Sequence, residues 1–191
     1  MSTFKFKVIS LKRRQDRRKK FSNTFKHINF EFVDALDGQT YKLTKFDKEF
    51  IKGNEYKKYG IHIPSLVCAN YMHLNLLDEC SKGDVPFFIF EDDVELIKPI
   101  DFSFKDIAKK NLDVYWLIPN HHSIIAYVVW PSGAKILIDY INEVKLDKGL
   151  DWKFHDIKGS GLLREEQLPS SYFTQQAGVN SDITSLKNYA L

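Results

Sequence analysis

The sequence predicts an α/β fold in which a mostly parallel central sheet is flanked by helices. Stretches with the length and patterning of strands alternate with helical stretches along most of the chain. A continuous apolar run at residues 86–90 is typical of a strand that is covered on both faces. The composition, with 43% hydrophobic and 28% charged residues, is that of a globular protein. A length of 191 residues is enough to bury a core, so we expect one domain over residues 1–191.

The first predicted elements are two strands with a basic helix between them. Residues 4–11 alternate Phe with Lys and then turn apolar, which predicts a strand. In the basic segment that follows, Phe21 and Phe25 lie one helical turn apart, so we expect a helix to about residue 26. Residues 28–33 predict a second strand, which ends in the loop DALDG at residues 34–38.

Two helices are expected before the next strand. Residues 44–51 predict a short one. Pro64 then begins a long helix to about residue 82, with its apolar positions near one face, and Gly83 ends it. The apolar run at residues 86–90 follows as a strand.

The last third of the chain gives signals that weaken toward its end. Residues 113–118 and 124–130 predict two strands, and Pro131 begins a helix to about residue 141. A short helix is expected near residues 150–155. Beyond it we expect a Gly-rich stretch and a loop-like tail.

The positive charge of the chain is concentrated in one segment. Residues 12–20 (KRRQDRRKK) contain seven basic side chains and one acid, whereas the whole chain has a net charge of +3. We expect most of these side chains to form a solvated face, with one or two arginines turned toward a site. A nucleic-acid surface is an alternative, but the segment has no recognisable nucleic-acid motif and the rest of the chain is slightly acidic. We therefore expect no nucleic-acid partner.

The sequence also indicates where the protein works. No apolar run approaches the roughly 20 residues that are needed to span a bilayer, so we expect no transmembrane segment, while peripheral membrane contact stays open. The first twenty residues do not have the pattern of a secretory signal. Cys68 and Cys80 are too few for a disulfide framework. A reducing, cytoplasmic location is the expectation.

Three acids directly follow the apolar run, at Glu91, Asp92 and Asp93. At the carboxyl end of a strand in an open α/β sheet, they would face the crevice in which ligands bind. Unpaired, they would repel one another and raise each other's pKa values. Mg²⁺ or Mn²⁺ removes that penalty, because both ions prefer carboxylate oxygen and leave positions open for a diphosphate. A solvated turn is the alternative, and the acids alone do not separate a transferase from a hydrolase.

The start of the basic helix is a second candidate for ligand binding. It follows the first strand directly, so it should lie along the same edge of the sheet as the acids. Cations and free backbone N–H groups at a helix start can hold phosphate oxygens. We expect Arg13 and Arg17 to contribute to such a contact.

Several short blocks occur in a fixed order along the chain. They are VISL (8–11) with DRR (16–18), FVDALDG (32–38), NYMHL (70–74), FIFEDDV (88–94), AYVV (126–129) with GA (133–134), LDW (150–152) and SDI (181–183). In this order and spacing they resemble the motifs of glycosyltransferase family 25, the group of lipooligosaccharide galactosyltransferases and collagen galactosyltransferase domains. The resemblance runs over nearly the whole chain, and the block with the three acids is its most informative part.

The resemblance implies a GT-A-like fold and a metal-dependent, inverting glycosyltransferase. Such an enzyme would move a hexose, galactose or glucose, from a UDP-sugar to a hydroxyl of a glycan, glycolipid or protein, with Mn²⁺ or Mg²⁺ as cofactor. The expected metal ligands are Asp93, Asp92 and Asp182, with His155 as a further candidate. The expected donor-binding residues are Ser10, Arg13, Arg17, Asp34, Asn70, Glu91 and Asp92.

Asp151, in the LDW block, is the expected general base that deprotonates the acceptor hydroxyl. A helix cap is the alternative role for this residue, since Asp is favoured there. Trp152 beside it would stack on a sugar or pack in the core. His73 would either contact a ligand or fill a hydrogen-bonded position in the packing of its helix.

The chain departs from the family pattern at a few positions. The family's GEiGC stretch corresponds to SLVCA at residues 65–69, and its Ser before the His corresponds to Met72. Ser10 stands for an Asn, and Ala126 for a Gly. Two alternatives therefore stay open: a degenerate GT-A domain with a binding or scaffolding role, and a metal-dependent phosphohydrolase that uses the same acids.

Overall fold

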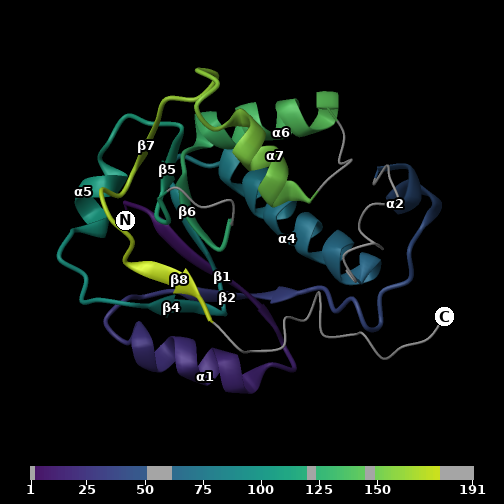
Figure 1. The fold of residues 1–191 in the computed structure, drawn as a ribbon, viewed down its shortest axis with the longest axis horizontal. Coiled ribbons are helices and arrows are strands. Elements are labelled where there is room, and N and C mark those ends of the chain that lie inside the picture. The colour runs from purple at the N-terminus through teal and green to yellow at the C-terminus, as the bar shows by residue number, and fades with distance from the viewer. Residues whose placement is uncertain (1–2, 51–61, 120–123, 145–148, 177–191) are drawn as a thin grey trace.

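A six-stranded sheet with the strand order β2-β1-β3-β6-β5-β7 forms the centre of the structure (Figure 1). The computed structural model describes residues 3–50, 62–119, 124–144 and 149–176. The strands of the sheet are β1 (Lys5–Leu11), β2 (Glu31–Ala35), β3 (Phe87–Glu91), β5 (Val114–Trp116), β6 (Ala126–Val129) and β7 (Glu165–Gln167). β2, β1 and β3 are parallel, β5 and β7 are parallel, and β6 runs antiparallel to β3 and β5. The sheet is therefore mostly parallel, with one reversed strand.

Helices and a short ribbon cover the two faces of this sheet. Figure 1 shows α4, α6 and α7 on one side, with α1 and the ribbon β4–β8 on the other. The helices are α1 (Gln15–Thr24), α2 (Lys45–Phe50), α4 (Ile63–Ser81), α5 (Phe104–Ala108), α6 (Pro131–Val144) and α7 (Leu150–Ile157). The ribbon pairs β4 (Val94–Leu96) with β8 (Phe173–Gln175) in antiparallel register.

Alternation along the strands divides the interior into two cores. In β3, Phe87 and Ile89 belong to the core under α4, α6 and α7, whereas Phe88 and Phe90 belong to the core on the other face. All four side chains are fully buried. This explains why the run at residues 86–90 is apolar without a break: both faces of the strand are covered.

The predicted fold class is confirmed, and most predicted elements are present with ends shifted by a few residues. The second strand begins at Glu31 rather than at residue 28, and Ile28 and Phe30 before it pack against the core next to α1. The expectation of a loop-like tail is wrong for β7 and β8, and β4 and α5 were not predicted at all. None of the helices in the described ranges is long and apolar enough to cross a membrane.

Candidate active site

The acidic cluster lies at the carboxyl edge of the parallel strands β1, β2 and β3. The register pairs Ile9 with Glu91 and Ser10 with Asp34, so the three strands end side by side. The backbone N–H of Asp92 donates to the carbonyl oxygen of Ile9 at 3.1 Å, which extends the contact by one residue. The start of α1 follows β1 at the same edge, as the sequence predicts.

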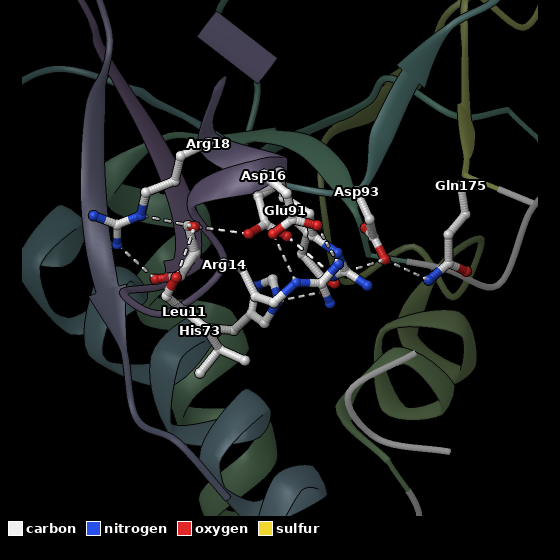
Figure 2. A network of polar contacts seen from close by, with 11 residues as sticks. Leu11, Arg14, Asp16, Arg18, His73, Glu91, Asp93 and Gln175 are labelled. Atoms are coloured by element: carbon white, nitrogen blue, oxygen red, sulfur yellow. Dashed lines mark hydrogen bonds and ion pairs between the residues drawn. The ribbon is translucent and has the colours of Figure 1, made fainter. Parts of the chain in front are cut away.

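The hydrogen-bond partners of the three acids come from the first strand and helix, from α4 and from β8; Figure 2 shows Glu91 near His73 and Asp93 near Gln175. Asp92 accepts from the Ser10 hydroxyl at 2.7 Å and from Nη1 of Arg17 at 3.2 Å. Asp93 accepts from Nε2 of Gln175, on β8, at 3.1 Å. Glu91 lies 3.1 Å from Nε2 of His73, on α4. Each acid is therefore held in place by a different side-chain hydrogen bond.

Burial dominates the electrostatics of the two aspartates. The side chains of Asp92 and Asp93 are 7% and 9% exposed. Burial and the nearby charge of Glu91 raise the pKa of Asp93 to about 6, against the hydrogen bond from Gln175. Burial also raises the pKa of Asp92, although Ser10 and Arg17 partly offset this. Arg17 supplies the compensating charge, since its Nη1 lies 3.7 Å from Oδ2 of Asp93 as well.

One carboxylate oxygen of the cluster is available to a cation. Oδ1 of Asp93 is buried and has no hydrogen-bond partner among the residues that the structure describes. A buried carboxylate oxygen in this state is costly, and a hard divalent cation would satisfy it. The donor chemistry of Asp93, with Asp92 next to it, therefore fits Mn²⁺ or Mg²⁺.

The described residues do not complete a metal shell by themselves. Among them, no group of three or more His, Cys, Asp or Glu side chains is arranged to hold an ion. His155 is exposed on α7, where its ring packs against that of Trp152. The predicted ligand Asp182 lies outside the described residues.

Arginines near the start of α1 are already paired with acids of this chain, so a diphosphate would have to compete with those acids for them. Nε of Arg13 lies 2.6 Å from Oδ2 of Asp37, in the loop after β2. Arg18 bridges Ser10 and Asp34: it donates to the Ser10 carbonyl oxygen at 2.9 Å and to the Asp34 carboxylate at 2.6 Å. The Arg18 hydrogen bond lowers the pKa of Asp34. These ion pairs tie the start of α1 to β2.

A cavity of about 100 Å³ opens beside the cluster. It lies between the ends of β1, β2 and β3, the first half of α4 and the end of β8, and Glu91, Asp92 and Asp93 all line it. Ser10 and Arg17 line it as well, whereas Arg13, Asp34, Asn70 and Asp151 are not among its lining residues. Met72 faces this cavity at the position of the Ser in the resembled motif.

Asn70 and Asp151 lie together where α4 meets α7. Oδ1 of Asn70 accepts from the backbone N–H of Leu150 at 3.2 Å, which fixes the start of α7. Nδ2 of Asn70 is buried and has no partner in the described part of the chain. Asp151 is in the first turn of α7, and burial together with the charge of Glu91 raises its pKa. Trp152 beside it is 48% exposed, so it is not a core residue.

Two residues of this site were missed by the sequence reasoning. Gln175 reaches Asp93 from β8, and the backbone N–H of Gln176 donates to the Asp93 carbonyl oxygen at 2.8 Å. The hydroxyl oxygen of Tyr127 lies 3.1 Å from Nδ1 of His73. The AYVV block contained a signal for Tyr127, namely a polar group in an apolar strand, whereas nothing in the sequence around Gln175 indicates a site.

Comparisons with known proteins agree with this geometry. The chain matches the family described as "Glycosyltransferase family 25 (LPS biosynthesis protein)" over residues 4–117, which is more than half of its length. No curated protein matches it significantly. The structure is similar to the crystal structure of a glycosyltransferase involved in the glycosylation of the major capsid of PBCV-1, with a TM-score of 0.50, 11% sequence identity and 95% of each chain covered. At this identity the similarity shows a shared fold.

Proposed function

The chain belongs to glycosyltransferase family 25, and we propose that this glycosyltransferase moves a hexose from a UDP-sugar to a hydroxyl of a glycan, glycolipid or protein. We further propose that the transfer inverts the anomeric carbon and depends on Mn²⁺ or Mg²⁺. Galactose and glucose are the sugars that the family resemblance favours.

The buried Asp93 is the observation that carries the proposal. Its Oδ1 has no partner among the described residues, its pKa is raised, and it lines a cavity at the carboxyl edge of the sheet. Asp93, Asp92 and Asp182 would hold the cation, which when bound would stabilise negative charge on a departing diphosphate. The cavity of about 100 Å³ is smaller than a whole nucleotide sugar, so part of the donor would lie across its mouth.

Asp151 is the proposed general base. The acceptor hydroxyl would give its proton to the Asp151 carboxylate while its oxygen forms a bond to the anomeric carbon, and the bond from that carbon to the diphosphate would break. The raised pKa of Asp151 supports this role, because a base works best when its pKa approaches the operating pH. The half-exposed ring of Trp152 next to it offers an apolar face to a sugar.

Calorimetric titration with UDP tests the metal site. We expect binding that requires Mn²⁺ in the wild type, that is lost in Asp93→Asn and that persists in Asp156→Asn, a control that removes an exposed acid on α7. Equal UDP affinity in the wild type and in Asp93→Asn would contradict the role of Asp93.

Product analysis with a panel of UDP-sugars tests the reaction. We expect slow, Mn²⁺-dependent release of UDP and free hexose in the absence of acceptor. Asp151→Asn should lose transfer to an added acceptor while it keeps UDP binding. Release of UMP or phosphate would support a phosphohydrolase instead, and UDP binding without turnover of any donor would support a binding domain.

A further inference from the structure

His73 lies between two polar groups that come from two different strands. It is on α4 and only 2% exposed, with Nδ1 3.1 Å from the hydroxyl of Tyr127 and Nε2 3.1 Å from Oε1 of Glu91. Its ring stacks on that of Tyr127, with centroids 5.8 Å apart and an interplanar angle of 28°. Figure 2 shows His73 reaching up from its helix toward the acidic cluster.

The register of the sheet brings these three side chains together. Tyr127 on β6 is paired with Ile89 on β3, and Glu91 follows Ile89 by two residues, so its side chain leaves β3 on the same face. That is the face that α4 covers, since Ile89, Tyr127 and Met72 share one core. His73, which follows Met72 on α4, therefore lies within hydrogen-bond distance of both the Tyr127 hydroxyl and the Glu91 carboxylate.

Only one placement of protons satisfies all three residues. Tyr127 is fully buried, and burial raises its pKa well above the ordinary value, so its hydroxyl keeps its proton. Within the described chain, Nδ1 of His73 is the acceptor available to that proton. Nδ1 then carries no hydrogen, and the ring hydrogen is on Nε2, where it donates to Glu91.

We infer that His73 is a positioning residue: the chain Tyr127 O–H to His73 Nδ1 and His73 Nε2–H to Glu91 Oε1 holds the Glu91 carboxylate as a hydrogen-bond acceptor that faces the cavity. Glu91 is 28% exposed on its side chain and lines the cavity, so a ligand in the cavity can reach its carboxylate. A fixed carboxylate selects a hydrogen-bond donor and repels a phosphate. The inference rests on the proposed function in assigning a hydroxyl of the sugar nucleotide to this position.

Nitrogen NMR of the ligand-free protein tests the proton placement directly. With ¹⁵N-labelled histidines, assigned by comparison with His73→Gln, we expect His73 to show an unprotonated Nδ1 and a protonated Nε2. In Tyr127→Phe, which removes only the hydroxyl, the Nδ1 signal should shift because Nδ1 loses its hydrogen-bond donor, while the Glu91 carboxylate keeps the ring hydrogen on Nε2. Tyr115→Phe is the matched control, because Tyr115 is a buried tyrosine on β5 that belongs to the core on the opposite face. A protonated Nδ1 in the wild type, or an unchanged His73 signal in Tyr127→Phe, would overturn the inference.

The KM for the donor tests whether this chain of hydrogen bonds positions Glu91 for donor binding. A lost neutral hydrogen bond corresponds to about a fivefold weaker affinity, so Tyr127→Phe should raise the KM for the donor about fivefold with little change in kcat. His73→Gln, which keeps an N–H donor near Glu91, should bind the donor better than His73→Leu. A structural role alone would lower the fraction of folded protein and leave KM unchanged. If the expected tautomer is present but no UDP-sugar binds, the proposed function fails while the positioning of Glu91 stands.

Discussion

At the residue scale, a single guanidinium lies against two buried carboxylates and partly compensates their charge. Arg17 is 8% exposed on its side chain and contacts both Asp92 and Asp93. Removing one partner of a buried ion pair leaves an uncompensated charge, which costs about 3–5 kcal/mol. Arg17→Met should therefore lower the free energy of unfolding by about that amount at neutral pH, as measured by urea denaturation.

Arg17→Lys serves as the control for this prediction, because it keeps the charge and loses only the planar geometry. It should be less destabilised than Arg17→Met. Mn²⁺ should stabilise Arg17→Met more than the wild type, since a bound cation replaces the missing positive charge. An Arg17→Met protein as stable as the wild type would show that the ion pair does not hold the cluster.

Asp113, which lies outside the candidate site, should make the stability of the fold depend on pH. Its carboxylate accepts from the Arg164 side chain at 2.8 and 2.9 Å and from the Ser132 hydroxyl at 2.6 Å, and the Arg164 hydrogen bonds lower its pKa to about 2. The folded-state pKa lies below the unfolded one, so this stabilisation is complete above about pH 4 and is lost as the pH falls toward 2.

Comparison of the wild type with Asp113→Asn isolates this contribution. Because Arg164 is 52% exposed, solvent screening limits the contribution to about 1–2 kcal/mol. We expect the difference in unfolding free energy between the two proteins to shrink by that amount between pH 5 and pH 2. A difference that stays constant over this window would contradict the prediction.

The acids of the site were predictable at this scale, whereas their partners were not. Three carboxylates directly follow an apolar run in the sequence, and they lie where strand patterning predicts. Gln175 is an ordinary polar residue near the end of the chain, and its contact with Asp93 depends on β8 pairing with β4. Such a contact is a property of the folded chain and leaves no local pattern.

At the scale of elements, the strength of the local pattern decided what the sequence could predict: β5 has only three residues, but it lies in the apolar stretch 114–118 and was predicted. α4 and β1 carry long periodic patterns and were predicted close to their observed ends. β4, β7 and β8 contain three residues each, which is too short for a period to show. The sequence pattern also could not predict that β6 runs antiparallel to β3, because a strand covered on both faces is apolar whichever way it runs.

The start of α6 packs so closely on β5 that it requires a glycine. A Cβ atom at Gly133 would collide with the backbone carbonyl of Asp113, directly before β5. Gly133→Ala should therefore lower the free energy of unfolding by about 1–3 kcal/mol, the usual cost of overpacking. Gly83→Ala is the control, since a Cβ there meets its nearest atom at an ordinary 3.4 Å. Equal stability of the two variants in urea would contradict the close approach.

At the scale of the whole molecule, residues from both ends of the chain build each core and the site. The core next to α1 combines Phe6 and Phe21 with Phe173, and the aromatic ring of Phe173 lies 5.5 Å from that of Phe90. The site joins Ser10 and Arg17 to Gln175 through the acids after β3. The described residues therefore cannot be divided by a cut in the chain into two parts that each keep a complete core.

This interdependence predicts a single cooperative unfolding transition. Tryptophan fluorescence reports on β5, the end of β6 and α7, through Trp116, Trp130 and Trp152, whereas far-ultraviolet circular dichroism reports on the whole backbone. The two signals should give the same midpoint in urea. Phe173→Ala should shift both midpoints together and cost about 3–5 kcal/mol, because Phe173 is 1% exposed in the core on the face away from α7. Separate midpoints, or a shift of one signal alone, would show that the chain folds as more than one unit and would contradict the expectation of a single domain.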